Sequence, residues 1–229
     1  MTTIIGLLPT GRLLAEVSLW SADLGRLADD IARVEPETDM FHIDVADGHF
    51  APAMLFFPDL VARARKATKK PLHVHLMVAD AILEAQIEQF AEAGADVISV
   101  HVENETAGDA LASIRRRGLT GGLVLKLETP VAAAADHLGS IGILTLLGTR
   151  LGVKGQGLDA TAGPRLQAAA TMIAASGATQ RILLAADGGI RDTTVPLLRQ
   201  SGAQTVVMGS LMFGEKDLPA RMTWLRALI

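Results

Sequence analysis

Residues 42–50 carry two side chains suited to metal binding or to acid and base chemistry. An apolar run, residues 40–45, holds His42 and Asp44 at alternate positions and stops at Asp47-Gly48. The pattern predicts a strand that ends in a turn, and side chains two apart on a strand share a face. His42 and Asp44 therefore suit a divalent metal, proton transfer, or both, although a His–Asp hydrogen bond in a core would give the same pattern.

Two further apolar runs end in histidine or aspartate. Residues 72–77 contain His75, and residues 182–186 lead into Asp187 and two glycines. The separations between His42, His75 and Asp187 are far too long for a local metal loop. Any site that these residues share has to be assembled by the fold.

The order of the predicted elements indicates the fold class. Eight strands are expected, at residues 16–20, 40–45, 72–77, 97–102, 119–127, 141–147, 181–186 and 205–208. Helices are expected between and after them, at about 21–34, 59–68, 80–93, 106–117, 130–138, 161–176, 193–200 and 218–228. Strict alternation favours a closed α/β barrel, the (β/α)8 TIM barrel, over an open doubly wound sheet. We expect residues 1–229 to form a single such domain.

Polar residues are predicted to gather at one end of this barrel. The carboxyl ends of all the strands open on one face, which is where barrel enzymes place their active sites. The residues expected there are Ser18, His42, Asp44, His75, Met77, His101, Lys126, Asp187 and Ser210. Their convergence from almost the whole length of the chain is the strongest indication of a site.

The composition limits the partners and the ligands. A formal net charge of −4 provides no basic field, which argues against nucleic acid and anionic membrane surfaces as partners. The chain has no cysteine, so a metal site would use histidine and carboxylate ligands. Because the N-terminal residues make a poor signal peptide and no apolar run reaches membrane-spanning length, we expect a cytoplasmic protein.

Two glycine-containing pairs follow the last two predicted strands. They are Gly188-Gly189 and Gly209-Ser210. The latter half of a barrel commonly binds phosphate on backbone N–H groups, and glycine permits the close approach. Either pair alone could be an ordinary turn, but two pairs after adjacent strands indicate a phosphate site.

With these motifs the chain resembles the ribulose-phosphate 3-epimerase family from about Val17 onward. The matching pieces are Ser18–Asp23, His42–Phe50, Val74–Val78, Ala91–Asp96, Val100–Glu103, Asp187–Ile190 and Gly209-Ser210. The resemblance implies a barrel of the ribulose-phosphate-binding type. It also implies an isomerase that inverts C3 of a ketose phosphate, such as ribulose 5-phosphate, through an ene-diolate.

The resemblance also implies roles for individual residues. His42, Asp44, His75 and Asp187 would bind one divalent metal, and Asp44 and Asp187 would be the catalytic acid and base. Their ligand types do not choose among Zn, Fe, Mn and Co. Substrate contacts are expected from Ser18, His75, Met77, Gly188, Gly189, Gly209 and Ser210, with Lys154 as an anion contact particular to this chain. The expected partners are a small-molecule sugar phosphate and further copies of the chain in a homo-oligomer.

Four departures from the family pattern concern the parts that cover and grip the substrate. Ala46 stands for a methionine, and His73 stands for an aspartate; we interpret His73 as an interior histidine. Residues 126–130 replace an Asn-Pro turn, and residues 148–156 replace the glycine-rich sixth loop. The new loop adds the cations Arg150 and Lys154, and Lys126 adds a third. We expect this loop to act as a lid that selects a substrate other than, or broader than, ribulose 5-phosphate.

Three alternative functions differ in what they require of the residues. An epimerase of another keto-sugar phosphate, such as allulose 6-phosphate or a tetrulose phosphate, would use the same acid and base. A non-catalytic phosphate-binding barrel would have little reason to keep all four metal ligands. A decarboxylase of this fold would want a lysine on the Asp44 strand, which has none.

Overall fold

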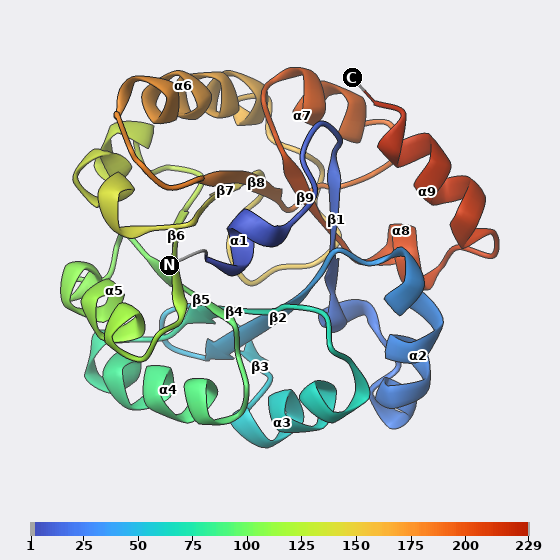
Figure 1. The fold of residues 1–229 in the computed structure, drawn as a ribbon, viewed down its shortest axis with the longest axis horizontal. Coiled ribbons are helices and arrows are strands. Elements are labelled where there is room, and N and C mark those ends of the chain that lie inside the picture. Colours follow the sequence, from blue (N-terminus) through green and yellow to red (C-terminus); the bar gives the residue numbers. More distant parts are fainter. Residues whose placement is uncertain (1–2, 229) are drawn as a thin grey trace.

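Eight parallel strands close into a barrel in the computed structural model, which describes residues 3–228 (Figure 1). The barrel strands are β1 Leu14–Ser18, β2 Met40–Asp47, β4 Leu72–Met77, β5 Val97–His101, β6 Thr120–Leu125, β7 Ile143–Leu147, β8 Leu183–Asp187 and β9 Thr205–Met208. β1 pairs in parallel with both β2 and β9, which closes the ring. The predicted (β/α)8 fold class is confirmed.

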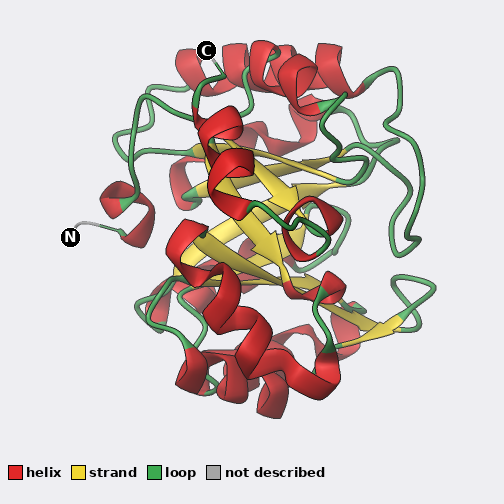
Figure 2. Cartoon of the chain, turned by 90° about the vertical axis from the view of Figure 1, so that its right-hand side faces the viewer, coloured by secondary structure: helices red, strands yellow, loops and turns green. Residues whose placement is uncertain are grey.

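Helices surround the barrel on all sides, as Figures 1 and 2 show. They are α2 Leu27–Val34, α3 Pro58–Ala67, α4 Asp80–Glu92, α5 Ala107–Arg116, α6 Ala162–Ala175, α7 Val195–Gln200, α8 Ser210–Phe213 and α9 Leu218–Arg226. A further helix, α1 Ile4–Leu7, lies over one end of the barrel. Within residues 3–228, no helix is both long enough and apolar enough to cross a membrane.

Side chains alternate along each strand between the helix-facing side and the barrel interior. On β2 the outward Phe41, Ile43 and Val45 join the main apolar core beneath the helices, while His42 and Asp44 face the barrel interior. Because both faces are covered, the strands are buried along almost their whole length, as their near-continuous apolar sequences predict.

Several element boundaries differ from those predicted. The first strand is residues 14–18, and Ser18 caps a 3₁₀ turn, Leu19–Ser21. A second 3₁₀ turn, Leu24–Arg26, precedes α2, so the α-helix begins at Leu27 and the prediction of a helix from residue 21 is wrong. The Ser18 hydroxyl oxygen and the Asp23 carboxylate accept hydrogen bonds from the backbone N–H groups of Trp20 and Gly25, which favours these turns over a continuous helix.

Three other segments were predicted differently or not at all. The segment predicted as a helix at 130–138 is a 3₁₀ segment, Val131–Ser140. A third 3₁₀ turn, Glu35–Glu37, follows α2. A two-residue strand, β3 Met54–Leu55, pairs antiparallel with the end of β2. An element that short carries no periodicity for a sequence to show.

The helix α1 closes the amino-terminal end of the barrel, opposite the long loops in Figure 2. Ile5 is fully buried and packs with Leu14, Met40 and other residues of the lowest interior layer. The Arg181 guanidinium donates hydrogen bonds to the carbonyl oxygens of Ile5 and Leu8, at 3.1 and 2.8 Å. Ligands therefore reach the barrel from the other end.

A polar layer lies above this plug inside the barrel. It includes Glu16, His73 and Ser99, all fully buried. Gly122 on β6 faces the same space, because a Cβ added there would collide with Ser99 and lie 2.5 Å from Ile143 Cγ2. Gly122 therefore leaves the room that the Ser99 side chain occupies.

We expect Gly122→Ala to lower the free energy of unfolding by about 1–3 kcal/mol, because the new methyl group overpacks the interior. Urea denaturation followed by circular dichroism measures the change. Gly139→Ala is the matched control: a Cβ at Gly139 meets nothing within 4 Å, so its effect should stay within about 0.5 kcal/mol. Equal stabilities of the Gly122 variant and the wild type would contradict the packing described here.

Candidate metal and catalytic site

Four predicted ligands meet at the carboxyl ends of β2, β4 and β8. His42, Asp44, His75 and Asp187 each offer one ligand atom, and these atoms all lie within 4.8 Å of one another. His42 Nε2 lies 3.2 Å from Asp44 Oδ1 and 4.0 Å from Asp187 Oδ2. His75 Nδ1 lies 3.4 Å from Asp44 Oδ1 and 3.9 Å from Asp187 Oδ2. Two imidazole nitrogens and two carboxylates thus converge on one point.

One ligand nitrogen in this cluster is buried without a partner. Among residues 3–228, no group makes a hydrogen bond with His75 Nδ1, even though Asp44 lies near it. Buried polar atoms are nearly always paired, so an orphaned nitrogen calls for an explanation. A divalent cation bound between the carboxylates and the two imidazoles would supply the missing partner, and the donor set suits such an ion.

A chain of hydrogen bonds sets the tautomer of His75. His101 Nδ1 lies 2.9 Å from Glu103 Oε2, a carboxylate that can only accept a hydrogen bond. Burial lowers the pKa of His101 to about 4, so the ring is neutral and its Nε2 is an acceptor. His75 Nε2, 2.9 Å away, therefore donates to it. This contact directs His75 Nδ1 toward the cluster.

The two carboxylates differ in their affinity for protons. Burial raises the pKa of Asp44, but His42 and His75 beside it outweigh burial and hold that pKa well below its usual range. Burial raises the pKa of Asp187 to about 6, and the nearby Asp44 charge acts in the same direction. Such a difference between neighbouring carboxyl groups is typical of an acid and base pair.

His42 also favours its charged form in this environment. Burial lowers its pKa, but the carboxylates of Asp44 and Glu16 on either side outweigh burial and raise that pKa well above its ordinary value. Protons and a divalent cation would therefore compete for the same side chains.

A cavity of about 380 Å³ leads from solvent to these residues. The predicted substrate contacts Ser18, His75, Met77, Gly188, Gly189, Gly209, Ser210 and Lys154 all line it, together with Asp44 and Asp187. The Ser18 hydroxyl donates to Asp44 Oδ2 at 2.9 Å. His42 lies behind this lining, fully buried. A volume of this size fits a small phosphorylated sugar.

The glycine pairs line the side of the cavity formed by the last two strands. Gly188 and Gly189 have φ of 87° and 70°, a region that favours glycine. A Cβ on Gly189 would lie 2.7 Å from Leu158 Cα, and one on Gly209 would collide with the Ser21 side chain. Both turns therefore bring backbone, without side chains, to the cavity wall.

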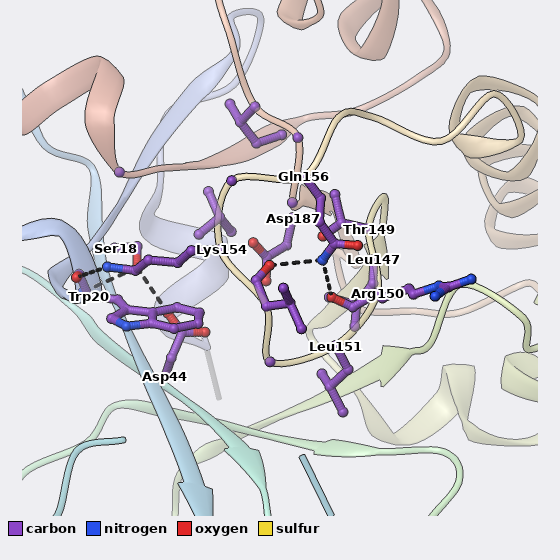
Figure 3. A pocket seen from close by; sticks show the side chains of 18 of the residues that line it. Ser18, Trp20, Asp44, Leu147, Thr149, Arg150, Leu151, Lys154, Gln156 and Asp187 are labelled. Atoms are coloured by element: carbon purple, nitrogen blue, oxygen red, sulfur yellow. Dashed lines mark hydrogen bonds between the residues drawn. The ribbon is translucent and has the colours of Figure 1, made fainter. Parts of the chain in front are cut away.

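The mouth loop, residues 148–156, covers one side of the cavity (Figure 3). Gln156 Nε2 donates to the carbonyl oxygens of Arg150 and Val153, at 2.9 and 2.8 Å, which holds the loop in a tight curve. The Lys154 ammonium donates to the Trp20 carbonyl oxygen at 2.5 Å and lies 4.6 Å from the centroid of the Trp20 ring. This cation thus faces the cavity from above Ser18 and Asp44.

The two other added cations lie differently from Lys154, although Arg150 also belongs to the cavity lining. Figure 3 shows the Arg150 side chain extending away from Asp187 and Lys154. The Lys126 ammonium lies 3.7 Å from the centroid of the Phe50 ring, and Lys126 is absent from the cavity lining within residues 3–228. Of the three added cations, Lys154 is the one predicted as an anion contact, and it lies in the cavity lining.

Ala46 also lies outside the lining that residues 3–228 give the cavity, so its small size does not enlarge the pocket. It packs with Ala51 and Met77, and Leu151 of the mouth loop packs against this small cluster. The hairpin after β2 and the mouth loop therefore fill the space beside Ala46. His73 is an interior residue, as interpreted from the sequence: it is fully buried in the polar layer.

Sequence reasoning missed three residues that shape the site. Glu16 contacts His42, Glu103 orients His101, and Trp20 holds Lys154. Glu16 precedes Ser18 by two positions, and Glu103 follows His101 by two, so alternation along each strand was an available signal. Nothing in the local sequence connects Trp20 with Lys154, because only the fold brings them together.

A model of the ribulose-phosphate 3 epimerase family matches residues 14–213. The ribulose-phosphate 3-epimerase of Bacillus subtilis is 34% identical over 202 residues, which cover 87% of this chain and 92% of that protein. The Synechocystis protein of the same name is 34% identical over 200 residues, covering 86% of this chain and 85% of that protein.

Solved structures of lower identity share the architecture. A 3-hexulose-6-phosphate synthase superposes with a TM-score of 0.66 at 18% identity, covering 95% of this chain and 99% of that one. An orotidine 5'-phosphate decarboxylase from Pyrococcus horikoshii gives a TM-score of 0.63 at 13% identity, with coverages of 93% and 97%. At these identities the similarity establishes the barrel fold alone.

Proposed function

Because the chain belongs to the ribulose-phosphate 3-epimerase family and is an isomerase of the racemase and epimerase class, we propose that it inverts C3 of a ketose phosphate with a bound divalent metal. The observation that carries the proposal is the cluster of two carboxylates and two imidazole nitrogens at the inner end of the cavity. Ribulose 5-phosphate and xylulose 5-phosphate are the reference pair of substrates.

The cluster supplies the groups that inversion needs. Asp44 and Asp187 come from strands on different parts of the ring, so they can act on opposite faces of a bound ketose. One carboxylate removes the C3 proton to give an ene-diolate, and the other carboxyl group delivers a proton to the opposite face. Zn, Fe, Mn or Co held by His42, Asp44, His75 and Asp187 would supply stabilisation of the developing negative charge.

The remaining residues of the cavity bind and orient the substrate. We assign the phosphate to the backbone of Gly188, Gly189, Gly209 and Ser210, where the glycine turns permit close approach. Gly209 packs closely against the side chain of Ser21, the residue that follows Trp20. The Lys154 ammonium donates to the Trp20 carbonyl oxygen and so lies near this glycine turn. The ammonium can therefore add a charge-assisted contact to an anionic substrate.

We expect the purified protein to bind Zn²⁺ or Co²⁺, and His42→Ala and His75→Ala each to weaken binding by more than about 100-fold. Removing a ligand costs more than removing an outer partner, which costs roughly 10–100-fold. Competition with a chelating dye measures the affinities. His49→Ala, an exposed histidine outside the cluster, is the control and should bind as the wild type does. Wild-type affinity in both ligand variants would contradict the site.

The same affinity should depend on pH. Because the pKa of Asp187 lies at about 6, this carboxyl group holds a proton below that pH, and the cation must displace it. Binding should weaken as the pH falls below about 6, and competition with the His42 proton should keep it dependent on pH above that value as well. Titration calorimetry in two buffers of different ionisation enthalpy should detect proton release near that pH. An affinity that stays constant down to about pH 5 would count against the assignment of Asp187 as a ligand.

Asp44→Asn and Asp187→Asn should each reduce kcat/KM by at least about 100-fold, because proton transfer by a positioned carboxylate contributes roughly 10²–10⁴-fold. The measurement is exchange of the C3 proton of ribulose 5-phosphate with deuterium oxide, together with metal content. Asp192→Asn, an exposed carboxylate on the loop after β8, should retain wild-type exchange. Undiminished exchange in the double Asn variant would exclude this acid and base pair.

Lys154→Met should lower kcat/KM for the phosphorylated substrate by about tenfold, in keeping with roughly 1–3 kcal/mol for a charge-assisted contact. Arg150→Ala is the control within the same loop, since that side chain points away from Asp187 and should leave kcat/KM unchanged. The substrates to be compared are pentulose, hexulose and tetrulose phosphates, each with its dephosphorylated form. A kcat/KM for ribulose 5-phosphate far above all others, unaltered in Lys154→Met, would show that the loop does not select the substrate.

A further inference from the structure

Glu16 is a fully buried carboxylate on β1 that lies inside the barrel behind the proposed metal ligands. Its Oε1 atom lies 2.6 Å from His42 Nδ1 and 2.5 Å from His73 Nδ1. A buried charge is costly unless it is paired and hydrogen-bonded. Two histidine ring nitrogens, from β2 and β4, thus surround one oxygen of this carboxyl group.

The contact with Glu16 determines which nitrogen of His42 faces the cluster. A carboxylate oxygen that contacts two ring nitrogens accepts a hydrogen bond from each, so His42 Nδ1 carries a hydrogen. His42 Nε2 is then the nitrogen directed at Asp44 and Asp187, at 3.2 and 4.0 Å. A negative charge behind the ring also makes Nε2 a stronger donor to a cation.

His73 anchors Glu16 rather than binding a metal itself. Its Nδ1 donates to Glu16, and its Nε2 lies 2.6 Å from the Ser99 hydroxyl, so both ring nitrogens are engaged. A cation needs about 2.0–2.2 Å to each ligand atom, and the contacts of 2.5–2.6 Å around Glu16 leave no room for one between them. Glu16, His42 and His73 form a hydrogen-bonded set and not a second metal site.

We propose that Glu16 is a positioning residue of the metal site, which fixes the tautomer and orientation of His42 and thereby strengthens the binding of a divalent cation. The inference rests on the proposed function, because it requires that His42 bind a metal. His75 receives the corresponding support by another route, through His101 from Glu103.

Glu16→Gln tests the inference, because it removes the charge and keeps the size of the side chain. We expect the affinity for Zn²⁺, measured by chelator competition, to fall about 10–100-fold, the usual cost of losing an outer partner of a ligand. Thr145→Val is the matched control: Thr145 is also fully buried in a barrel strand, and its hydroxyl has no partner among residues 3–228. Its Zn²⁺ affinity should equal that of the wild type.

A double-mutant cycle separates positioning from a general effect on the core. In a His42→Ala background, Glu16→Gln should change the Zn²⁺ affinity by less than about twofold, because the ligand that it supports is gone. A purely structural role would lower the affinity by the same factor in both backgrounds. That result, or wild-type affinity in Glu16→Gln alone, would overturn the inference.

Glu16→Asp enters the same cycle if the Gln variant does not fold. The shorter side chain cannot reach both histidines from the same backbone position, so we expect a loss of Zn²⁺ affinity that again disappears in the His42→Ala background. Unchanged affinity in Glu16→Asp would overturn the inference. A wild-type protein that binds neither Zn²⁺ nor Co²⁺ would contradict the proposed metal function. Normal binding by the wild type, with unchanged affinity in the Glu16 variants, would contradict this inference only.

Discussion

The buried charge of Glu16 is the constraint around which the interior of this barrel is arranged. A carboxylate with no access to water has to be matched by donors, and His42 and His73 supply them from neighbouring strands. Ser99 then engages the far side of His73, and Gly122 leaves the space for Ser99. The polar layer is therefore a connected set of contacts between the apolar plug below and the cavity above.

The same layer links the fold to the chemistry at the mouth. Strand alternation places His42 beneath the cavity and Asp44 two residues further along, at its inner end. His75 is supported separately by His101 and Glu103. Each histidine of the cluster thus has its own carboxylate behind it, one in direct contact and one through a second ring. These contacts hold both imidazole rings in place through the protein alone.

Apolar packing holds the segments that cover the cavity, whereas hydrogen bonds between polar side chains connect the residues beneath it. The hairpin after β2 and the mouth loop pack on each other through Ala46, Ala51 and Leu151. Gln156 and the contact of Lys154 with Trp20 give the mouth loop its shape. The cover of the cavity is therefore held by contacts separate from those that orient His42 and His75.

The sequence by itself determined the barrel and the four converging residues, because strict strand and helix alternation and polar strand ends are local patterns that survive folding. It did not determine the 3₁₀ turns after β1, the two-residue strand β3 or the plug α1, which depend on single hydrogen bonds and on packing. Only the tertiary structure decided that Lys154 reaches Trp20 while Lys126 lies on Phe50, and that Ala46 is covered rather than open to the cavity. It also decided that Glu16 contacts His42, because the closure of the barrel and the cost of burying a charge set how these interior side chains meet.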